Sequence, residues 1–595
     1  MTHTFHIPVL GLAFSIDTAL KVAQYGISSV ISLVDDELLE RMRAYYSKLY
    51  ERPYQTIIKQ EEDARAKRIT AYLDLIQEIV EEQMHQLKYS DWLVNPSVQQ
   101  YFTLLANEHP HKQLFSQWME TKNDVEKLKL TEEIRAAFQM GNIDVNIMSK
   151  VDKINFSKNG EALDAQYSDA SAAIRGFAKS KLSSSVVLSA GMNPQLYAYL
   201  SELDVFLPNA EGQFTKKITL KVSDYRSSLI QAKYLAKRGI WVSEFRIESG
   251  LNCGGHAFAT EGSLLGPILD EFAKNRQTLI AEVFAIYQEK LAEKNIFLQA
   301  PPAVLVTVQG GVGTAAEHQF LLKQYQVDAV GWGSPFLLVP EATTVDEFTL
   351  DALVHAAKDD FYLSNSSPLG VPFHNFKKST GEQDRLKRIA QGRPGYPCSK
   401  KYLVSDSTYT KEPVCTASRV YQVHKIKELE EMELSKEEFK NRYEQVVEKQ
   451  CLCEGLASAA YLKYDLLKPR ERQAVAICPG PNMAYFKKLY SLKEMVDHIY
   501  GRSNVLQDVE RPSMFINELE LYVQYLTKYI QSNLQDMDSK KTKYINRFNQ
   551  QLLEGIGYYR NLHQRITHSI NQTKDSFLES LNEYEKKLIP LIVKN

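Results

Sequence analysis

Two glycine-rich loops are the part of the sequence best suited to hold a phosphate group. Each follows a short apolar segment, 304–309 or 328–332, and a stretch long enough for one helix separates them. Glycine lets backbone N–H groups approach an anion closely, so a strand–loop–helix–strand unit of this kind can bind phosphate. The predicted phosphate contacts are Gly310, Gly311, Gly313 and Thr314 in the first loop, and Gly331, Gly333 and Ser334 in the second.

The same spacing argues against two common nucleotide sites. The first loop lacks the Lys-Ser/Thr pair of a P-loop, and no acidic residue follows where a dinucleotide site requires one. The pattern is instead typical of the last two strands of a (β/α)8 barrel, whose loops bind phosphate through bare backbone N–H groups. We therefore expect these loops to lie at the mouth of a parallel barrel.

A histidine in a third loop could move a proton. Residues 248–256 read Glu-Ser-Gly-Leu-Asn-Cys-Gly-Gly-His directly after a predicted strand. Imidazole titrates near neutral pH, so His256 is the candidate catalytic residue. Cys253 in the same loop is a second candidate, as nucleophile or thiolate, although a single cysteine is more often a small buried thiol.

The cysteines are unevenly distributed and suggest a metal site. Four thiolates can bind one iron–sulfur cluster, and a proline directly after a ligand cysteine is common in ferredoxin-like motifs. The long gaps match no ferredoxin or zinc-ribbon spacing, so zinc and plain reduced thiols stay open, as does the identity of the spare cysteine. The candidate ligands are Cys398, Cys415, Cys451, Cys453 and Cys478.

The loop Gly254-Gly255-His256 and the two phosphate loops together resemble the nitronate monooxygenases (2-nitropropane dioxygenases), a family of FMN-dependent barrels. The resemblance covers roughly the first 375 residues. It implies FMN as cofactor, the histidine as catalytic base, and flavin contacts from the glycine loops and from Gly254, Gly255, Asn146 and Lys221. Cys253 replaces the family's usual alanine, and the first-strand loop 9–15 follows the family only loosely. FMN binding is therefore better supported than nitronate oxidation.

The lysine at the end of a predicted strand could tune the flavin. A cation near N1 stabilises the negative charge of the reduced ring, and Lys221 is the expected residue. A surface lysine or a phosphate contact is the alternative reading of Lys221, and Lys150 is a second candidate for the flavin role.

Eight β-rich segments alternate with helical patterns, which predicts an α/β fold with a (β/α)8 TIM barrel. A charged helical stretch, about 36–140, interrupts the barrel after the second strand and could be a lid, a substrate wall, a buttress or a dimer contact. The predicted domains are the FMN-binding barrel (1–375), a cysteine-rich region (376–505) and a C-terminal helical bundle (506–595). The predicted strands are 8–14, 29–34, 143–148, 185–189, 217–222, 240–247, 303–308 and 329–338.

The charge balance gives no reason to expect nucleic acid or an anionic membrane as partner. The chain has 71 basic and 73 acidic residues, a formal net charge of -2, and no apolar run long enough for a membrane span. We expect a cytoplasmic enzyme acting on a small molecule, with an electron-transfer partner and self-association through the helical tail as further expectations.

The sequence is also compatible with three other functions. A barrel resembling inosine monophosphate dehydrogenase would use Cys253 as its nucleophile. A barrel without catalysis would act as a scaffold whose helical insertion and tail make the contacts. The basic residues clustered at 377–401 could dock an electron carrier or RNA, although such clusters are usually solvated surface.

Overall fold

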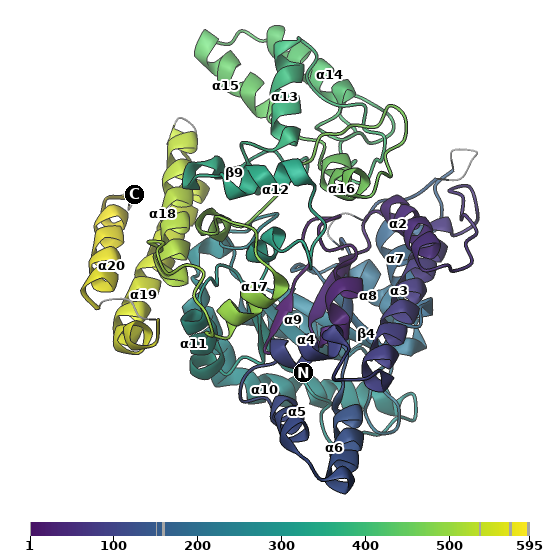
Figure 1. The fold of residues 1–595 in the computed structure, drawn as a ribbon. Coiled ribbons are helices and arrows are strands. Elements are labelled where there is room, and N and C mark those ends of the chain that lie inside the picture. Colours follow the sequence, from purple (N-terminus) through teal and green to yellow (C-terminus); the bar gives the residue numbers. More distant parts are fainter. Residues whose placement is uncertain (1, 150–151, 157–160, 535–536, 571–573, 592–595) are drawn as a thin grey trace.

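The structure, a computed structural model, describes residues 2–149, 152–156, 161–534, 537–570 and 574–591. Eight parallel strands form a closed barrel in chain order, and β1 pairs with β8 to close it (Figure 1). The predicted (β/α)8 barrel is therefore confirmed. The strands are β1 (Phe5–Ile7), β2 (Ser28–Ser32), β3 (Ile143–Asn146), β4 (Ser184–Leu188), β5 (Lys216–Val222), β6 (Val242–Glu248), β7 (Leu305–Gln309) and β8 (Ala329–Gly331).

The first and last strands differ from the prediction. Strand β1 ends before Pro8, because proline has no N–H for the strand ladder, and Gly11 takes the left-handed conformation at φ 54°. The predicted strand 8–14 is therefore a loop at the carboxyl end of β1. Strand β8 ends at Gly331, and the rest of the predicted strand forms the 3-10 helix η5 (Ser334–Leu338), with Pro335 in its first turn.

Helices cover the outside of the barrel, as the alternating pattern predicts. Each connection between successive strands carries at least one helix. The helices of the connections, apart from the long one after β2, are α1 (Thr18–Val22), α7 (Asp169–Lys179), α8 (Pro194–Ser201), α9 (Tyr225–Ala236), α10 (Leu265–Ala292) and α11 (Ala315–Tyr325).

The long connection after β2 is helical, as expected, and packs on the outside of the barrel. In α3 the buried residues recur at helical spacing, as in Ile69, Tyr72 and Ile76. Gly176 of α7 permits close packing, because a Cβ there would lie 2.8 Å from the Ala66 carbonyl oxygen of α3. The helices are α2 (Asp36–Leu49), α3 (Ala64–Tyr89), α4 (Pro96–Leu104), α5 (Pro110–Glu120) and α6 (Asp124–Ala137).

A charged cluster fills the barrel interior. Glu244, Arg246 and Glu248 alternate along β6 and therefore point to the same side of the strand. Arg246 Nε lies 2.8 Å from a Glu244 carboxylate oxygen, and Asp144 lies 3.6 Å from the same guanidinium. The buried charges compensate one another, which is the condition under which ion pairs are tolerated in a core. Glu248, at the end of β6, is the outermost of the three residues.

The chain beyond the barrel adds a hairpin and further helices. Strands β9 (Phe361–Ser364) and β10 (Phe373–Phe376) pair antiparallel. In Figure 1 α13 to α16 gather at one end of the molecule, and α18 to α20 stand beside α11. These helices are α12 (Glu347–Val354), α13 (Thr380–Ala390), α14 (Arg419–Glu430), α15 (Lys436–Val447), α16 (Leu452–Lys463), α17 (Leu492–Ile499), α18 (Met514–Asn533), α19 (Ser539–Ile570) and α20 (Lys574–Leu588).

The C-terminal helices pack against the barrel of their own chain. The Tyr559 hydroxyl of α19 accepts a hydrogen bond from the Gly266 amide of α10, and a Cβ at Gly266 would lie 2.5 Å from the Tyr559 ring. Glu518 of α18 accepts a hydrogen bond from the Leu265 amide. A face of this bundle is thus used within the chain, and self-association through the tail stays a prediction.

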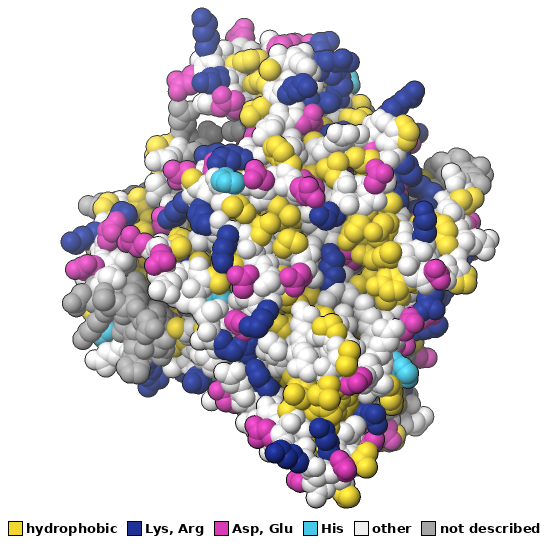
Figure 2. All heavy atoms as spheres, in the orientation of Figure 1, with side chains coloured by type: hydrophobic (Ala, Val, Ile, Leu, Met, Phe, Trp, Pro, Cys, Tyr) yellow, Lys and Arg dark blue, Asp and Glu magenta, His cyan; other side chains and the backbone are white. Residues whose placement is uncertain are grey.

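Basic and acidic side chains are interspersed over the face drawn in Figure 2, in keeping with the balanced charge of the sequence. Within the described ranges, no helix is long and apolar enough to cross a membrane.

Candidate functional site

A cavity of about 1000 Å³ opens at the carboxyl ends of the barrel strands. This is the end of the fold at which barrel enzymes carry their active sites. A residue at the end of every strand, or next to its end, contributes to the lining. These residues are Pro8, Ser32, Asn146, Ser189, Lys221, Glu248, Gln309 and Gly331.

The rest of the wall comes from the chain beyond the barrel. Leu369, Val371 and Phe373, around the hairpin, line the cavity together with segments of the cysteine-rich region. Among the described residues that line it, none comes from 36–140. The helical insertion therefore does not form a wall of this cavity, and its role as a buttress or a dimer contact stays a prediction.

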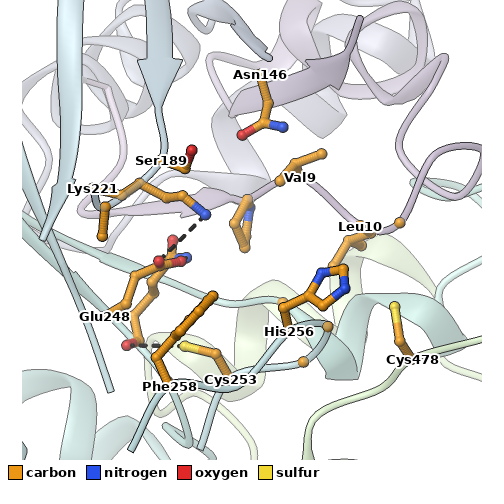
Figure 3. Close-up of a pocket in the computed structure, with 18 of the residues that line it drawn as sticks. Val9, Leu10, Asn146, Ser189, Lys221, Glu248, Cys253, His256, Phe258 and Cys478 are labelled. Carbon is orange, nitrogen blue, oxygen red and sulfur yellow. Dashed lines mark hydrogen bonds and ion pairs between the residues drawn. The ribbon is translucent and has the colours of Figure 1, made fainter. Parts of the chain in front are cut away.

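The structure brings the predicted cofactor residues together. All of them except Gly313 and Thr314 line this one cavity, as do His256, Cys253 and Cys478. The figure shows Asn146, Lys221 and His256 around the same space (Figure 3). Lys150, the second candidate for the flavin role, lies outside the described residues.

Gly313 and Thr314 are held by groups of the protein itself. Thr314 caps α11 by accepting a hydrogen bond from the Glu317 amide, and the Gly313 amide donates to the Glu317 carboxylate at 2.8 Å. Glu317 also pairs with Arg511 at 2.7 Å, and both side chains are buried, with 2% and 4% of their surface exposed. A carboxylate thus occupies the N-terminus of α11 that the sequence assigned to phosphate. The phosphate contacts that remain are in the other loop residues.

Glu317 and Arg511 were not predicted as site residues. They are far apart in sequence and stand in no recognisable motif, so nothing in the sequence links either residue to the glycine loop. Glu248 was also missed as a site residue, although it opens the loop that contains His256.

Lys221 and Glu248 form an ion pair at the cavity wall. The Lys221 ammonium lies 3.3 Å from a Glu248 carboxylate oxygen, and the side chains are 20% and 22% exposed. Gln309 donates a hydrogen bond to the other oxygen of Glu248 at 2.5 Å. The three residues come from neighbouring strands, β5, β6 and β7, so the barrel itself fixes their geometry. Figure 3 shows the ion pair of Lys221 and Glu248.

The loop that carries His256 is anchored on both sides. The Gly255 amide donates to the Cys478 carbonyl, and the His374 amide of β10 donates to the Gly255 carbonyl. The imidazole Nε2 lies 2.7 Å from Ser367 Oγ, and the ring packs on Phe373 with 4.9 Å between centroids. These contacts orient the imidazole at the cavity wall, where Figure 3 shows it.

Cys253 is a poor candidate nucleophile in this setting. Its thiol donates to the Gln309 carbonyl oxygen at 3.5 Å. Burial, and then the nearby Glu248 carboxylate, raise the pKa of Cys253 well above its usual value. The thiol is therefore protonated at neutral pH, whereas a cysteine nucleophile needs the thiolate.

The cysteines predicted as metal ligands do not form one group. Cys478, whose carbonyl accepts from the Gly255 amide, lines the cavity, as does Cys453 in the first turn of α16. Cys451 is the N-cap residue of α16, and Cys398 and Cys415 lie in the loop between α13 and α14. All are free thiols. In the part of the chain that the structure describes, no group of three or more His, Cys, Asp or Glu is arranged to hold a metal ion.

No protein-family model and no curated protein matches the chain. Solved structures that resemble it include the enoyl reductase domain of MlnA from the macrolactin cluster of Bacillus amyloliquefaciens, with 13% identity, 67% of this chain and 92% of that chain covered, and a TM-score of 0.36. FabK from Thermotoga maritima has 13% identity, with 69% of this chain and 86% of that chain covered and a TM-score of 0.30. Nitroalkane oxidase from Streptomyces ansochromogenes has 10% identity, with 85% of this chain and 95% of that chain covered and a TM-score of 0.33. Values this low carry no information about activity.

Proposed function

We propose that the chain is an FMN-dependent oxidoreductase similar to nitronate monooxygenases, with His256 as its proton-transfer residue. One observation carries the proposal. Residues that the sequence resemblance assigns to flavin and to catalysis, from widely separated parts of the chain, line a single cavity at the carboxyl end of the barrel.

The cavity suits FMN in size and in the chemistry of its walls. At about 1000 Å³ it can take the flavin ring together with the ribityl phosphate. Glycines from both phosphate loops line the cavity, where a phosphate could approach backbone N–H groups, and Lys221 lines it from β5. Leu10, Leu12 and Phe14, in the loop after β1, add an apolar surface for a flat aromatic ring.

Bound FMN would supply acceptance of a hydride or of single electrons from the substrate. The chain's own side chains would bind the flavin and orient the substrate beside it. Lys221 is held at the cavity wall by its ion pair with Glu248, and Ser367 sets the orientation of the His256 ring. The imidazole is then ready to take a proton from a carbon acid or to return one.

The proposed substrate class is the alkyl nitronates. An alkyl nitronate is a small conjugated anion, and the family resemblance makes it the first substrate to test. The pairing of Lys221 with Glu248 leaves the strand ends nearly neutral, so recognition of such an anion would depend on hydrogen bonds from residues such as His256.

The test is turnover by the FMN-loaded protein. Wild type and His256→Ala are compared for anaerobic reduction of the flavin by a neutral nitroalkane, which must first lose its α-proton, and by the corresponding alkyl nitronate, which has already lost it. His355→Ala is the control, because His355 is 71% exposed and pairs only locally with Asp351. We expect His256→Ala to keep FMN and to lose roughly 10²- to 10⁴-fold in rate with the nitroalkane, and far less with the nitronate. Equal rates of wild type and His256→Ala with the nitroalkane would contradict the role of His256 as base. No flavin reduction by the nitronate in wild type would contradict the nitronate as substrate.

Two of the three alternative functions make predictions that the site and the cofactor content can test. An enzyme resembling inosine monophosphate dehydrogenase would need Cys253 as thiolate, and the raised pKa of Cys253 opposes that. A non-catalytic scaffold predicts a colourless protein that does not take up FMN.

A further inference from the structure

The segment 478–482, beyond the barrel, lies against three loops at the barrel mouth. These are the two phosphate loops and the loop that carries His256, beside which Figure 3 shows Cys478. A hydrogen bond joins the segment to each loop. The bonds are Gly255 N to Cys478 O at 3.0 Å, Gly480 N to Ser334 Oγ at 2.8 Å and Asn482 Nδ2 to Val312 O at 2.7 Å.

The contact with the His256 loop requires glycine. A Cβ at Gly254 would lie 2.5 Å from the Cys478 carbonyl oxygen and 2.9 Å from the Gly480 amide nitrogen, which is closer than such atoms pack. Gly254 therefore permits the approach of the segment in addition to lining the cavity. The position of the segment at the barrel mouth is thus fixed on both sides of the contact.

The first phosphate loop is held by its carbonyl oxygens. Three successive carbonyls each accept a hydrogen bond from a side chain beyond residue 480. The donors belong to three separate elements, the 3-10 helix η7 (Pro481–Tyr485), α17 and the loop before α18. The bonds are Arg511 Nη2 to Gly311 O at 2.6 Å, Asn482 Nδ2 to Val312 O at 2.7 Å and His498 Nε2 to Gly313 O at 2.8 Å.

The three donors are themselves oriented by hydrogen bonds. Arg511 Nε donates to Asn482 Oδ1 at 2.9 Å, so the amide nitrogen of Asn482 is the atom that faces the loop. His498 Nδ1 accepts from the Val505 amide, which places the ring proton on Nε2, toward the loop carbonyl. All three donor side chains are buried. The loop is therefore held by preformed donors.

Holding the carbonyls in this way leaves an amide directed at the cavity. In a planar trans peptide, the N–H of the next residue points opposite to the carbonyl. The Gly311 carbonyl points to Arg511, which does not line the cavity, so the Val312 amide points away from Arg511, and Val312 does line the cavity. Among the described residues, no group accepts a hydrogen bond from the Val312 amide. Donors to the carbonyls also polarise the peptide groups, which strengthens their N–H groups toward an anion.

The second phosphate loop is prepared by the same segment. Ser334 Oγ accepts from the Gly480 amide, so the hydroxyl hydrogen can be donated to a ligand. Ser334 lines the cavity. A hydroxyl whose oxygen already accepts a hydrogen bond is a stronger donor to an anion.

We propose that the segment 478–482, together with His498 and Arg511, is a positioning element of the flavin-phosphate site. By binding the loop carbonyls and Ser334 Oγ, it orients the Val312 amide and the Ser334 hydroxyl for a phosphate. The inference rests on the proposed FMN site and extends that site beyond the barrel. The barrel of residues 1–375 would thus depend on the chain that follows it for a complete phosphate site.

The test uses two flavins that differ only in the phosphate. Apoproteins of the full-length wild type and of variants are titrated with FMN and with riboflavin, and the ratio of the two dissociation constants measures the preference for the phosphate. Asn482→Ala removes the donor to the Val312 carbonyl. We expect the preference to fall by about tenfold in Asn482→Ala, as for one lost hydrogen bond, with the affinity for riboflavin little changed.

A second variant acts from outside the cavity. His498 does not line the cavity, so His498→Phe can act on the phosphate only through the loop, and it should lower the preference in the same direction. His498→Gln keeps a side-chain donor and should recover most of the preference. Asn549→Ala is the matched control, because buried Asn549 of α19 likewise donates to a carbonyl, that of Leu588, at 2.9 Å. It should keep the wild-type preference.

The outcomes separate this inference from the proposed function. Thermal unfolding of each apoprotein checks that it is folded. If the wild type binds FMN, an unchanged preference in Asn482→Ala and His498→Phe would overturn the inference alone. Equal losses of FMN and riboflavin affinity would also overturn it, because they would show a purely structural role. A wild type that binds neither flavin would overturn the proposed function, and this inference with it.

Discussion

The Lys221 ammonium lies 3.3 Å from the Glu248 carboxylate at the point where β5 and β6 end, on the wall of the large cavity. The sequence marks Lys221 as the cation that stabilises reduced flavin. The structure adds that this cation has a counter-charge, which Gln309 also contacts. Glu248 should therefore set how strongly Lys221 acts on a bound ring.

Replacing Glu248 by glutamine should raise the reduction potential of bound FMN. Lys221 would then act on the reduced ring without its counter-charge. The pair is partly exposed, so we expect a rise of roughly 20 mV, corresponding to about 1 kcal/mol. Potentiometric titration of wild type and Glu248→Gln measures the shift, with Glu261→Gln at an exposed surface pair as control. An unchanged or lowered potential would contradict the electrostatic role of the pair.

Removing the Ser367 hydroxyl should slow the reaction without weakening substrate binding. Ser367 Oγ lies 2.7 Å from His256 Nε2 and orients the ring. Losing this hydrogen bond in Ser367→Ala should lower kcat by up to about tenfold and shift its pH profile, with KM little changed. Ser367→Thr restores the hydroxyl and should recover most of the rate. Identical pH profiles for wild type and Ser367→Ala would remove Ser367 from the mechanism.

Glu317→Gln should destabilise the protein strongly. The carboxylate is the partner of buried Arg511 and accepts hydrogen bonds from the Gly313 and Met514 amides. Leaving a buried guanidinium unpaired typically costs about 3–5 kcal/mol. Thermal or urea unfolding of Glu317→Gln is compared with Glu261→Gln, whose exposed pair with Arg547 should be worth less than about 1 kcal/mol. Equal losses in the two variants would show that the buried pair is not structural.

Glu518 should make the folded protein less stable as the pH rises past neutral. Burial raises the pKa of Glu518 to about 7, while the Ser249 hydroxyl and the Leu265 amide donate to it. Because the folded pKa exceeds the unfolded value of 4.5, this stabilisation is complete below pH 4.5 and is lost as pH rises through 7.

The loss in the free energy of unfolding from ionisation of Glu518 amounts to at most about 3 kcal/mol. Glu518→Gln cannot ionise, so its free energy of unfolding should fall less than that of wild type between pH 5 and pH 8.5. Parallel pH profiles for the two proteins would mean that Glu518 does not titrate near neutrality.

The barrel could be predicted because its strands are short apolar runs separated by helical patterns, and because glycine-rich loops follow the last two strands. Residues of the loops at the strand ends, such as His256 and Gly331, could be predicted to meet because parallel strands bring their carboxyl ends together. The limit of β1 was missed because residues 9–14 are as apolar as a strand, and only Pro8 marks the end. Arg511 donates to the Gly311 carbonyl at 2.6 Å. This contact could not be predicted from sequence, because two segments far apart in the chain leave no local pattern.

FMN content tests the central claim most directly. The purified protein, and the apoprotein titrated with FMN, are measured by absorbance and by identification of the flavin released on denaturation. The account predicts one FMN per chain, with binding weakened by substitution of Lys221 or of Gly333 in the second phosphate loop. A colourless protein that binds no FMN on titration would contradict it.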